Sequence, residues 1–203
     1  MEGTRKSRLK EIVNWVANKS EKKDLVQSNT YWIYGLPGIG KTSLTHLICA
    51  SLHNQRQLAG AFFCRRDDPS LSEPTNILLM LIYKLTEIFP PFQKIVEYYL
   101  HNNTFLRPES MKGSLFRDFL DNLPRDPNNS LVFVIDTFDE CGNKRSCSDL
   151  LKHLICMAAS VSWLKIIITS RPEANIECIF EESPGLSCCR YDLAKDQAAS
   201  HDL

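Results

Sequence analysis

The chain has 203 residues, which is enough for one sizeable domain or two very small ones. Its 43% hydrophobic and 24% charged residues are an ordinary globular composition. The 24 lysines and arginines balance the 24 aspartates and glutamates, so the overall charge gives no electrostatic case for nucleic acid or an anionic membrane. We therefore expect neither a nucleic-acid partner nor a membrane partner.

The sequence also lacks the signals of export. No apolar run approaches the roughly 18–20 residues that span a bilayer, and the N-terminal MEGTRKSRLKEIVNWV has no uninterrupted apolar stretch of the signal-peptide kind. The eight cysteines show no CxxC spacing of the kind found in metal sites, and several lie within apolar runs. These features favour a reduced, cytoplasmic protein.

The first part of the chain predicts a helix, a strand and a second helix. Apolar residues at i, i+3, i+4 and i+7 indicate an amphipathic helix over about 5–18, and a polar linker follows it. Thr30–Tyr34 is a short β-rich run stopped by Gly35, which predicts a buried strand. An apolar helical stripe then starts near Lys41.

Strands and helices continue to alternate along the rest of the chain. Ser72 with Pro74 predicts a helix N-terminus, with Ser72 as the capping residue. The remaining expected strands are residues 58–64, 131–136, 165–170 and 187–193, and further helices are expected around 92–100, 110–122 and 150–155. This alternation predicts a three-layer α/β/α sandwich with a mainly parallel sheet of about five strands. Ligands of such sheets bind at the carboxyl ends of the strands.

The segment between the first strand and the helix at Lys41 matches the phosphate-loop (Walker A) pattern GxxxxGK[ST] in full. Its glycines allow backbone angles that turn N–H groups toward a phosphate chain, and the helix N-terminus adds its dipole. The Lys41 ammonium can reach the β- and γ-phosphates, and the Thr42 hydroxyl can ligate Mg²⁺. The expected nucleotide-binding residues are Gly35, Leu36, Pro37, Gly38, Ile39, Gly40, Lys41, Thr42 and Ser43.

A second acidic element follows the apolar run LVFVID. Asp136 closes this strand, where its carboxylate would face the phosphate loop and hold Mg²⁺ through water. Asp139 and Glu140 lie three and four residues further on, and either can orient or deprotonate a water in line with the γ-phosphate. Many hydrolytic P-loop proteins place a glutamate directly after the metal aspartate. Because this chain has Thr137 there, we expect slow hydrolysis.

Arg171 follows the strand-like run IIITS, and a guanidinium fixed at that edge can bind the γ-phosphate and report its loss. Two rival classes of nucleotide-binding protein are disfavoured. The chain has no [NT]KxD motif to read guanine, as a GTPase would need, and no LSGGQ-like stretch of a transporter ATPase.

Together these elements resemble the NACHT class of STAND signal-transduction ATPases, in particular fungal NOD-like receptors with a nephrocystin-like N-terminal NTPase domain. The matching segments are EGTRKSRLKEIVNWV, YWIYGLPGIGKTSL, LAGAFFCRRDD, LVFVIDTFDEC and LKIIITSRPE. The resemblance implies an ATP/ADP switch that uses Mg²⁺ within a larger receptor-like protein. It also implies roles: Lys41 and Thr42 serve phosphate and Mg²⁺, Asp136 the metal, Asp139 hydrolysis, and Arg171 the sensor.

We expect residues 1–29 to form an N-terminal helix and linker, and residues 30–203 an NTPase core that is incomplete at its C-terminus. Two functions remain open. The first is a switch that hydrolyses ATP slowly, which the intact motif residues favour. The second is a non-hydrolysing nucleotide-binding module for self-association or for docking of an unidentified protein, which Thr137 and the missing C-terminal region favour.

Overall fold

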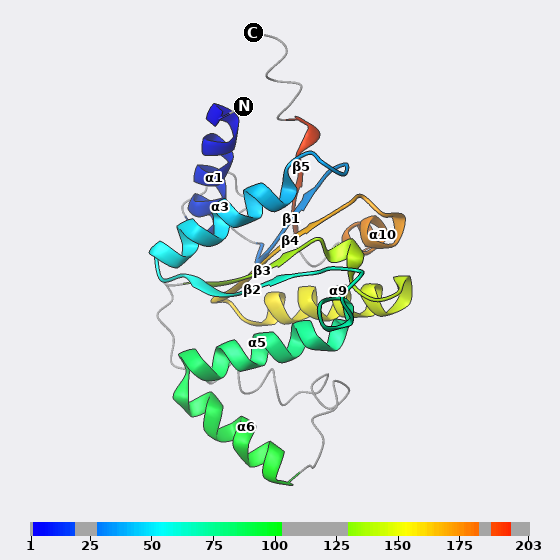
Figure 1. The fold of residues 1–203 in the computed structure, drawn as a ribbon. Helices are drawn as coiled ribbons and strands as arrows, with labels where there is room; N and C mark the ends of the chain where they lie inside the picture. The colour runs from blue at the N-terminus through cyan, green and yellow to red at the C-terminus, as the bar shows by residue number, and fades with distance from the viewer. Residues whose placement is uncertain (1, 19–27, 103–129, 183–187, 196–203) are drawn as a thin grey trace.

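A five-stranded parallel sheet forms the centre of the molecule (Figure 1). The computed structural model describes residues 2–18, 28–102, 130–182 and 188–195. The strand order is β2-β3-β4-β1-β5, and every neighbouring pair is parallel. The strands are β1 (Thr30–Tyr34), β2 (Leu58–Phe63), β3 (Leu131–Asp136), β4 (Leu164–Ser170) and β5 (Cys188–Asp192). The predicted fold class and strand number are confirmed.

Helices cover both faces of the sheet. Helices α1 (Glu2–Val16) and α3 (Lys41–Asn54) lie on one face, and α5 (Pro74–Ile88), α9 (Lys144–Ser160) and α10 (Ala174–Glu182) lie on the other (Figure 1). Helix α6 (Pro90–Asn102) follows α5 and extends away from the sheet. Two short elements complete the description: α4 (Pro69–Ser72) and a 3₁₀ turn, η1 (Phe138–Glu140).

Alternation of side chains along the strands divides the apolar residues between two cores. On β1, Trp32 faces α10 and stacks on Phe180, with ring centroids 4.6 Å apart. Tyr31 and Ile33 face the opposite side, in the core that contains Leu44 of α3. Every residue of β3 and β4 is buried, as their apolar runs at residues 131–135 and 166–168 predict for central parallel strands.

The strand order determines which residues meet at the carboxyl edge of the sheet. Strand β4 lies between β1 and β3, with Tyr34 paired to Ser170 and Ile135 paired to Ile168. The loop after β1 and the turn after β3 are therefore separated by the end of β4. Residues at that end can contact both.

A buried lysine ties helix α1 to the sheet. Lys165 of β4 is fully buried, and its ammonium donates to the Trp15 carbonyl and to Asn18 Oδ1, each at 2.7 Å. The ammonium also lies 4.5 Å from the centre of the Trp15 ring. Burial lowers the pKa of Lys165 to about 8. A cation at the C-terminal end of α1 also complements the helix dipole, so α1 is built into the core rather than appended to it.

Some local expectations were wrong or lie outside the described residues. Ser72 does not cap a helix: it ends α4, and α5 begins at Pro74 with Glu73 at the N-cap position. The helix expected around 110–122 lies outside the described part of the chain. Helix α10 was not predicted.

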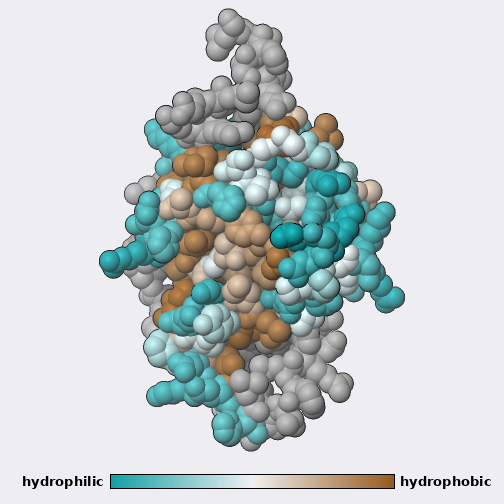
Figure 2. Space-filling model, viewed as in Figure 1, coloured by the Kyte–Doolittle hydropathy of each residue, from teal (hydrophilic) through white to brown (hydrophobic). Residues whose placement is uncertain are grey.

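The surface carries a band of hydrophobic residues on one face of the molecule (Figure 2). The band runs across the middle of that face, where edge strand β2 and helix α5 lie. Among the helices that the structure describes, no segment combines the length and apolar character needed to cross a membrane.

Candidate functional site: the phosphate loop and the Asp136 centre

The six residues between β1 and α3 form a loop with three glycines. Backbone conformation explains two of these glycines, and side-chain packing concerns the third. Gly38 and Gly40 have φ angles of 78° and 100°, in the left-handed region where a side chain would be strained. Gly35 has no such angle. A Cβ at Gly35 would lie 3.2 Å from the Ile39 side chain and 3.4 Å from Leu193, so a larger residue there would require the Ile39 side chain to shift by a few tenths of an ångström.

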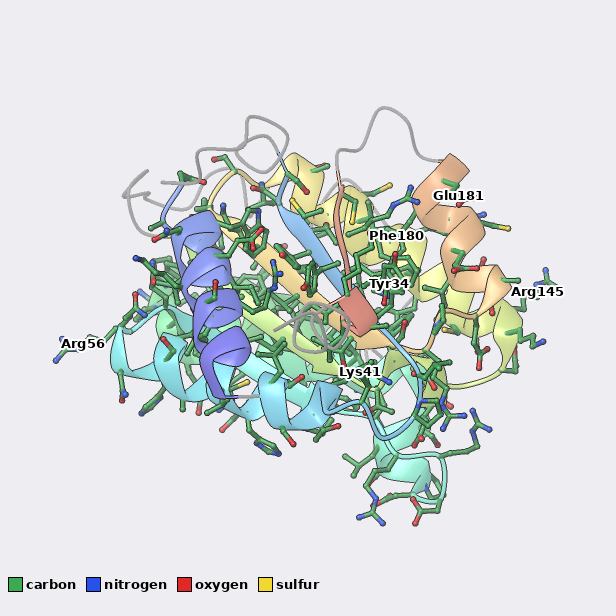
Figure 3. All side chains as sticks on the ribbon, turned by 90° about the horizontal axis from the view of Figure 1, so that it is seen from above. Tyr34, Lys41, Arg56, Arg145, Phe180 and Glu181 are labelled. Atoms are coloured by element: carbon green, nitrogen blue, oxygen red, sulfur yellow. The ribbon has the colours of Figure 1, made fainter. Side chains whose placement is uncertain are left out.

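The N-terminus of α3 has the properties of an anion site. Gly40 occupies the N-cap position without a side-chain cap, and no acidic residue lies in the first turn. The first N–H groups of an uncapped helix point outward and can bind a phosphate. Thr42 and Ser43 are exposed at this end. Arg56, just beyond the other end of α3, points away from the helix and from Lys41 (Figure 3).

Lys41 lies against the loop that precedes it. Its ammonium donates to the carbonyl oxygens of Gly35 at 2.7 Å and Leu36 at 3.0 Å. Burial lowers the pKa of Lys41, and the positive charge of Arg171 acts in the same direction. The negative charge of Asp139 opposes this more strongly than that of Asp136. Asp139 and Arg171 thus act electrostatically at the place where Lys41 would meet a phosphate.

Asp136 is buried at the end of β3 and is surrounded by hydroxyl groups. Its Oδ2 accepts from Thr42 at 2.7 Å and from Thr137 at 2.9 Å. Its Oδ1 accepts from Thr45 at 2.6 Å and from Thr169 at 2.5 Å. A buried carboxylate needs such donors, and these come from α3, β4 and the turn after β3.

Thr137 has an unusual backbone conformation. Its φ of 56° and ψ of 44° place a β-branched residue in the left-handed region, at a cost of about 1–2 kcal/mol. Two hydrogen bonds hold it there: its hydroxyl donates to Asp136, and its N–H donates to the Thr169 hydroxyl at 3.1 Å. This conformation bends the chain directly into η1, which carries Asp139 and Glu140.

Asp139 is paired with Arg171. The Asp139 side chain is fully buried, and its Oδ1 accepts the Arg171 backbone N–H at 2.9 Å. The Arg171 Nε lies 3.2 Å from Oδ2 of Asp139, yet that oxygen has no aligned hydrogen bond from any described residue. Arg171 itself is 42% exposed, so the guanidinium covers the carboxylate from the solvent side.

Glu140 points to the loop after β2. Its Oε2 accepts the backbone N–H of Arg66 at 3.1 Å, and the Arg66 guanidinium donates to the Asp139 carbonyl at 3.2 Å. A longer ion pair of 3.8 Å joins Glu140 to Arg171. The turn that carries both carboxylates is thus fastened on two sides by arginines.

The residues present fit a magnesium–nucleotide complex. Mg²⁺ takes oxygen ligands, and in nucleotide sites it binds one or two protein groups together with substrate phosphates. The Thr42 hydroxyl and the Asp136 carboxylate provide that donor set beside the phosphate loop. The described residues contain no arrangement of three or more His, Cys, Asp or Glu side chains that would hold a metal ion by themselves.

The predicted site residues fall into two groups. The structure brings the phosphate loop and Asp136 together, and it brings Asp139, Glu140 and Arg171 together. Sequence reasoning missed Arg66, Thr45 and Thr169, and it named Thr137 only as the residue in place of a glutamate, not as a donor to Asp136. The only sequence signal for Thr45 is its position three residues after Thr42, on the same face of α3.

The parallel sheet, with the phosphate loop between β1 and α3, defines a P-loop NTPase fold. The sequence model of the family "Nephrocystin 3, N-terminal" matches residues 9–171, and the chain belongs to that family. The expectation of a nephrocystin-like N-terminal NTPase domain is confirmed. A comparison with curated proteins gave no match.

Several solved structures have a similar fold. Cdc6p from Pyrobaculum aerophilum has 14% identity and a TM-score of 0.55, with 92% of this chain and 45% of that one covered. Orc1 of Aeropyrum pernix, in complex with DNA, has 16% identity and a TM-score of 0.55, covering 94% and 44%. Drosophila ORC bound to DNA gives 14% identity and a TM-score of 0.53, covering 93% and 29%. The chain thus spans less than half of each relative, and the likeness concerns the fold.

Proposed function

We propose that the protein is an ATP/ADP-binding switch module that binds nucleotide with Mg²⁺ and hydrolyses ATP slowly. The observation that carries this proposal is the 2.7 Å hydrogen bond between the Thr42 hydroxyl and Asp136. It joins a complete phosphate loop to the acidic end of a buried strand. The family membership and the P-loop fold support a nucleotide-binding module.

Each residue of the loop has a defined role in this proposal. The uncapped N–H groups at the start of α3 and the Lys41 ammonium bind the phosphates, and Lys41 exchanges its bonds to Gly35 and Leu36 for bonds to phosphate. Thr42 and Asp136 hold Mg²⁺, which neutralises charge on the phosphate oxygens when bound. The absence of a guanine-reading motif and the NACHT resemblance favour adenine.

We assign the water-orienting role to Asp139. Its Oδ2 is buried and has no hydrogen-bond partner among the described residues, and its charge acts on Lys41. Glu140, by contrast, is engaged by the backbone of Arg66 and anchors the turn. Arg171 covers Asp139 in this geometry. Rotation of Arg171 toward the γ-phosphate would uncover Asp139 for a water, so turnover would depend on that exchange and would be slow.

The wider setting follows the NACHT and STAND resemblance. In that setting the module is part of a cytoplasmic, NOD-like receptor protein and associates with other copies or with a protein partner when ATP replaces ADP. The balanced charge of the chain remains our reason to expect no nucleic-acid partner, although the Orc1 and ORC relatives are bound to DNA.

The direct test is calorimetric titration of the protein with ATP and ADP in the presence of Mg²⁺. Lys41→Ala should weaken ATP binding about 10-fold or more, because a charge-assisted hydrogen bond contributes roughly 1.5–3 kcal/mol. Lys152→Ala is the matched control, since Lys152 is exposed on α9. Equal affinities for the wild type and Lys41→Ala would refute the site. In competition against a fluorescent ATP analogue, better displacement by GTP than by ATP would refute the adenine preference.

A nucleotide-binding module without hydrolysis is the second candidate. The coverage of Asp139 by Arg171 and the presence of Thr137 in place of a glutamate favour it. A phosphate-release assay separates the two functions. Nucleotide affinity without detectable phosphate release would leave only this second function.

A further inference from the structure

The shell of Asp136 contains more donors than the phosphate-loop motif supplies. Of the four hydroxyls around its carboxylate, only Thr42 belongs to that motif. Thr45 and Thr169 both bond to Oδ1, at 2.6 and 2.5 Å, and both are buried together with Asp136. These are the shortest of the four contacts, in the range of strong charge-assisted bonds.

We propose that Thr45, with Thr169, is a positioning residue for Mg²⁺: the two hydroxyls fix Oδ1 and thereby turn Oδ2 of Asp136 toward Thr42. This inference rests on the proposed function, since it concerns the metal of the same nucleotide site. Neither hydroxyl touches the metal in this account. Both act through the orientation of the carboxylate.

The geometry of the donors supports a fixed orientation. Thr169 accepts the Thr137 N–H at 3.1 Å, so its single hydroxyl proton is committed to Asp136. Thr45 lies 3.0 Å from the Lys41 carbonyl and 2.6 Å from Asp136, and the shorter contact to a charged acceptor is the stronger one. Oδ1 is therefore held from α3 on one side and from β4 on the other.

The two oxygens of Asp136 consequently have different surroundings. Both partners of Oδ1 are buried threonines, whereas Oδ2 contacts Thr42, which is exposed at the start of α3, and Thr137, which is half-buried. Oδ2 is thus the oxygen that bonds to a residue of the phosphate-loop motif. Mg²⁺ demands near-ideal octahedral geometry, so a carboxylate that could rotate freely would bind the hydrated metal ion less tightly than a fixed one.

The expected size of the effect follows from metal sites in general. Loss of an outer-shell partner that orients a ligand typically lowers metal affinity by about 10–100-fold. Thr45→Val removes the hydroxyl and keeps the shape of the side chain, whereas Thr45→Ser restores a hydroxyl at the same place. Thr169→Val removes the second donor to the same oxygen and tests the inference at an independent position.

The experiment measures Mg²⁺ affinity and nucleotide affinity separately. Mg²⁺ is titrated into each protein saturated with ADP, and ADP binding is also measured in EDTA. Thr45→Val should lower Mg²⁺ affinity at least about 10-fold and leave ADP affinity in EDTA unchanged, while Thr45→Ser stays within about threefold of wild type. Thr86→Val is the control, because the Thr86 hydroxyl donates to a helix carbonyl on α5, away from the site.

Several results would overturn the inference. Wild-type Mg²⁺ affinity in both Thr45→Val and Thr169→Val would show that the hydroxyls do not position the carboxylate. An equal loss of ADP affinity with and without Mg²⁺ would show a structural role instead. If the wild type binds ADP with Mg²⁺, these results would overturn the positioning role and leave the proposed function intact. A wild type that binds no nucleotide would overturn both the positioning role and the proposed function.

Discussion

Two groups of carboxylates lie at the same edge of the sheet and are held in opposite ways. Asp136 ends a buried strand and accepts hydrogen bonds from four neutral hydroxyls, and none of its hydrogen bonds within the described residues comes from a cationic group. Asp139 and Glu140 lie on a 3₁₀ turn and are engaged by Arg171 and Arg66. Asp136 is thus left without a guanidinium or ammonium contact, whereas the Arg171 guanidinium lies 3.2 Å from Asp139 and 3.8 Å from Glu140.

This difference explains how one site can bind a nucleotide and still hydrolyse it slowly. Burying a carboxylate without a cation is costly, and hydroxyl donors reduce that cost without cancelling the charge. The Asp136 centre is therefore suited to attract Mg²⁺. The acidic turn must first exchange its arginine contacts before a water can be oriented, and that exchange adds a barrier to turnover.

The largest expected effect comes from removing the charge of the first group. Asp136→Asn keeps the shape of the side chain but removes the charge and replaces one acceptor oxygen by an NH₂ donor. We expect Mg²⁺-dependent nucleotide affinity to fall about 100-fold, since charge-assisted contacts contribute up to roughly 3 kcal/mol. Titration calorimetry with Mg²⁺–ADP measures this, with Asp149→Asn, exposed on α9, as control. An unchanged affinity would place the metal elsewhere.

The sequence predicted the parts of this site that depend on local pattern. Gly35–Thr42 forms a contiguous motif, and Asp136 ends an apolar run, so both were recognisable without a fold. The partners of these residues depend on strand order, which the sequence does not reveal: Thr169 meets Asp136 only because β4 lies between β1 and β3.

The same limit applies to backbone conformation and to capping. Nothing in the sequence indicates that Thr137 adopts a left-handed conformation, because two tertiary hydrogen bonds hold it there. The wrong assignment of Ser72 as a helix cap has a similar origin. The Asp68 side chain caps the short helix α4, so the chain is already helical before Ser72.

A smaller effect is expected when the arginine of the second group is removed. Arg171→Ala should weaken ATP binding about 10-fold and leave ADP binding nearly unchanged, since one charge-assisted bond to the γ-phosphate is lost. The two affinities are compared by competition with a fluorescent nucleotide. Arg145→Ala is the control, because Arg145 lies exposed at the start of α9, far from Lys41 (Figure 3). Equal losses for ATP and ADP would contradict a γ-phosphate contact.

The smallest effect is expected at Glu140. Glu140→Gln keeps an oxygen that can accept the Arg66 N–H, so the turn stays anchored. Turnover should fall only about two- to fivefold, because a neutral acceptor forms a weaker hydrogen bond than a carboxylate. Phosphate release is the assay, and Glu181→Gln on α10 is the control. A loss of about 100-fold or more would transfer the water-orienting role from Asp139 to Glu140.

The separation of binding from hydrolysis is tested most directly by Asp139→Asn. Phosphate release and Mg²⁺–ATP affinity are measured on the same preparation of the wild type and this variant. We predict that turnover falls about 100-fold or more, the typical loss when a general base is removed, while affinity stays within about threefold of wild type. Full turnover in Asp139→Asn, or a loss of affinity as large as that of Asp136→Asn, would contradict the account.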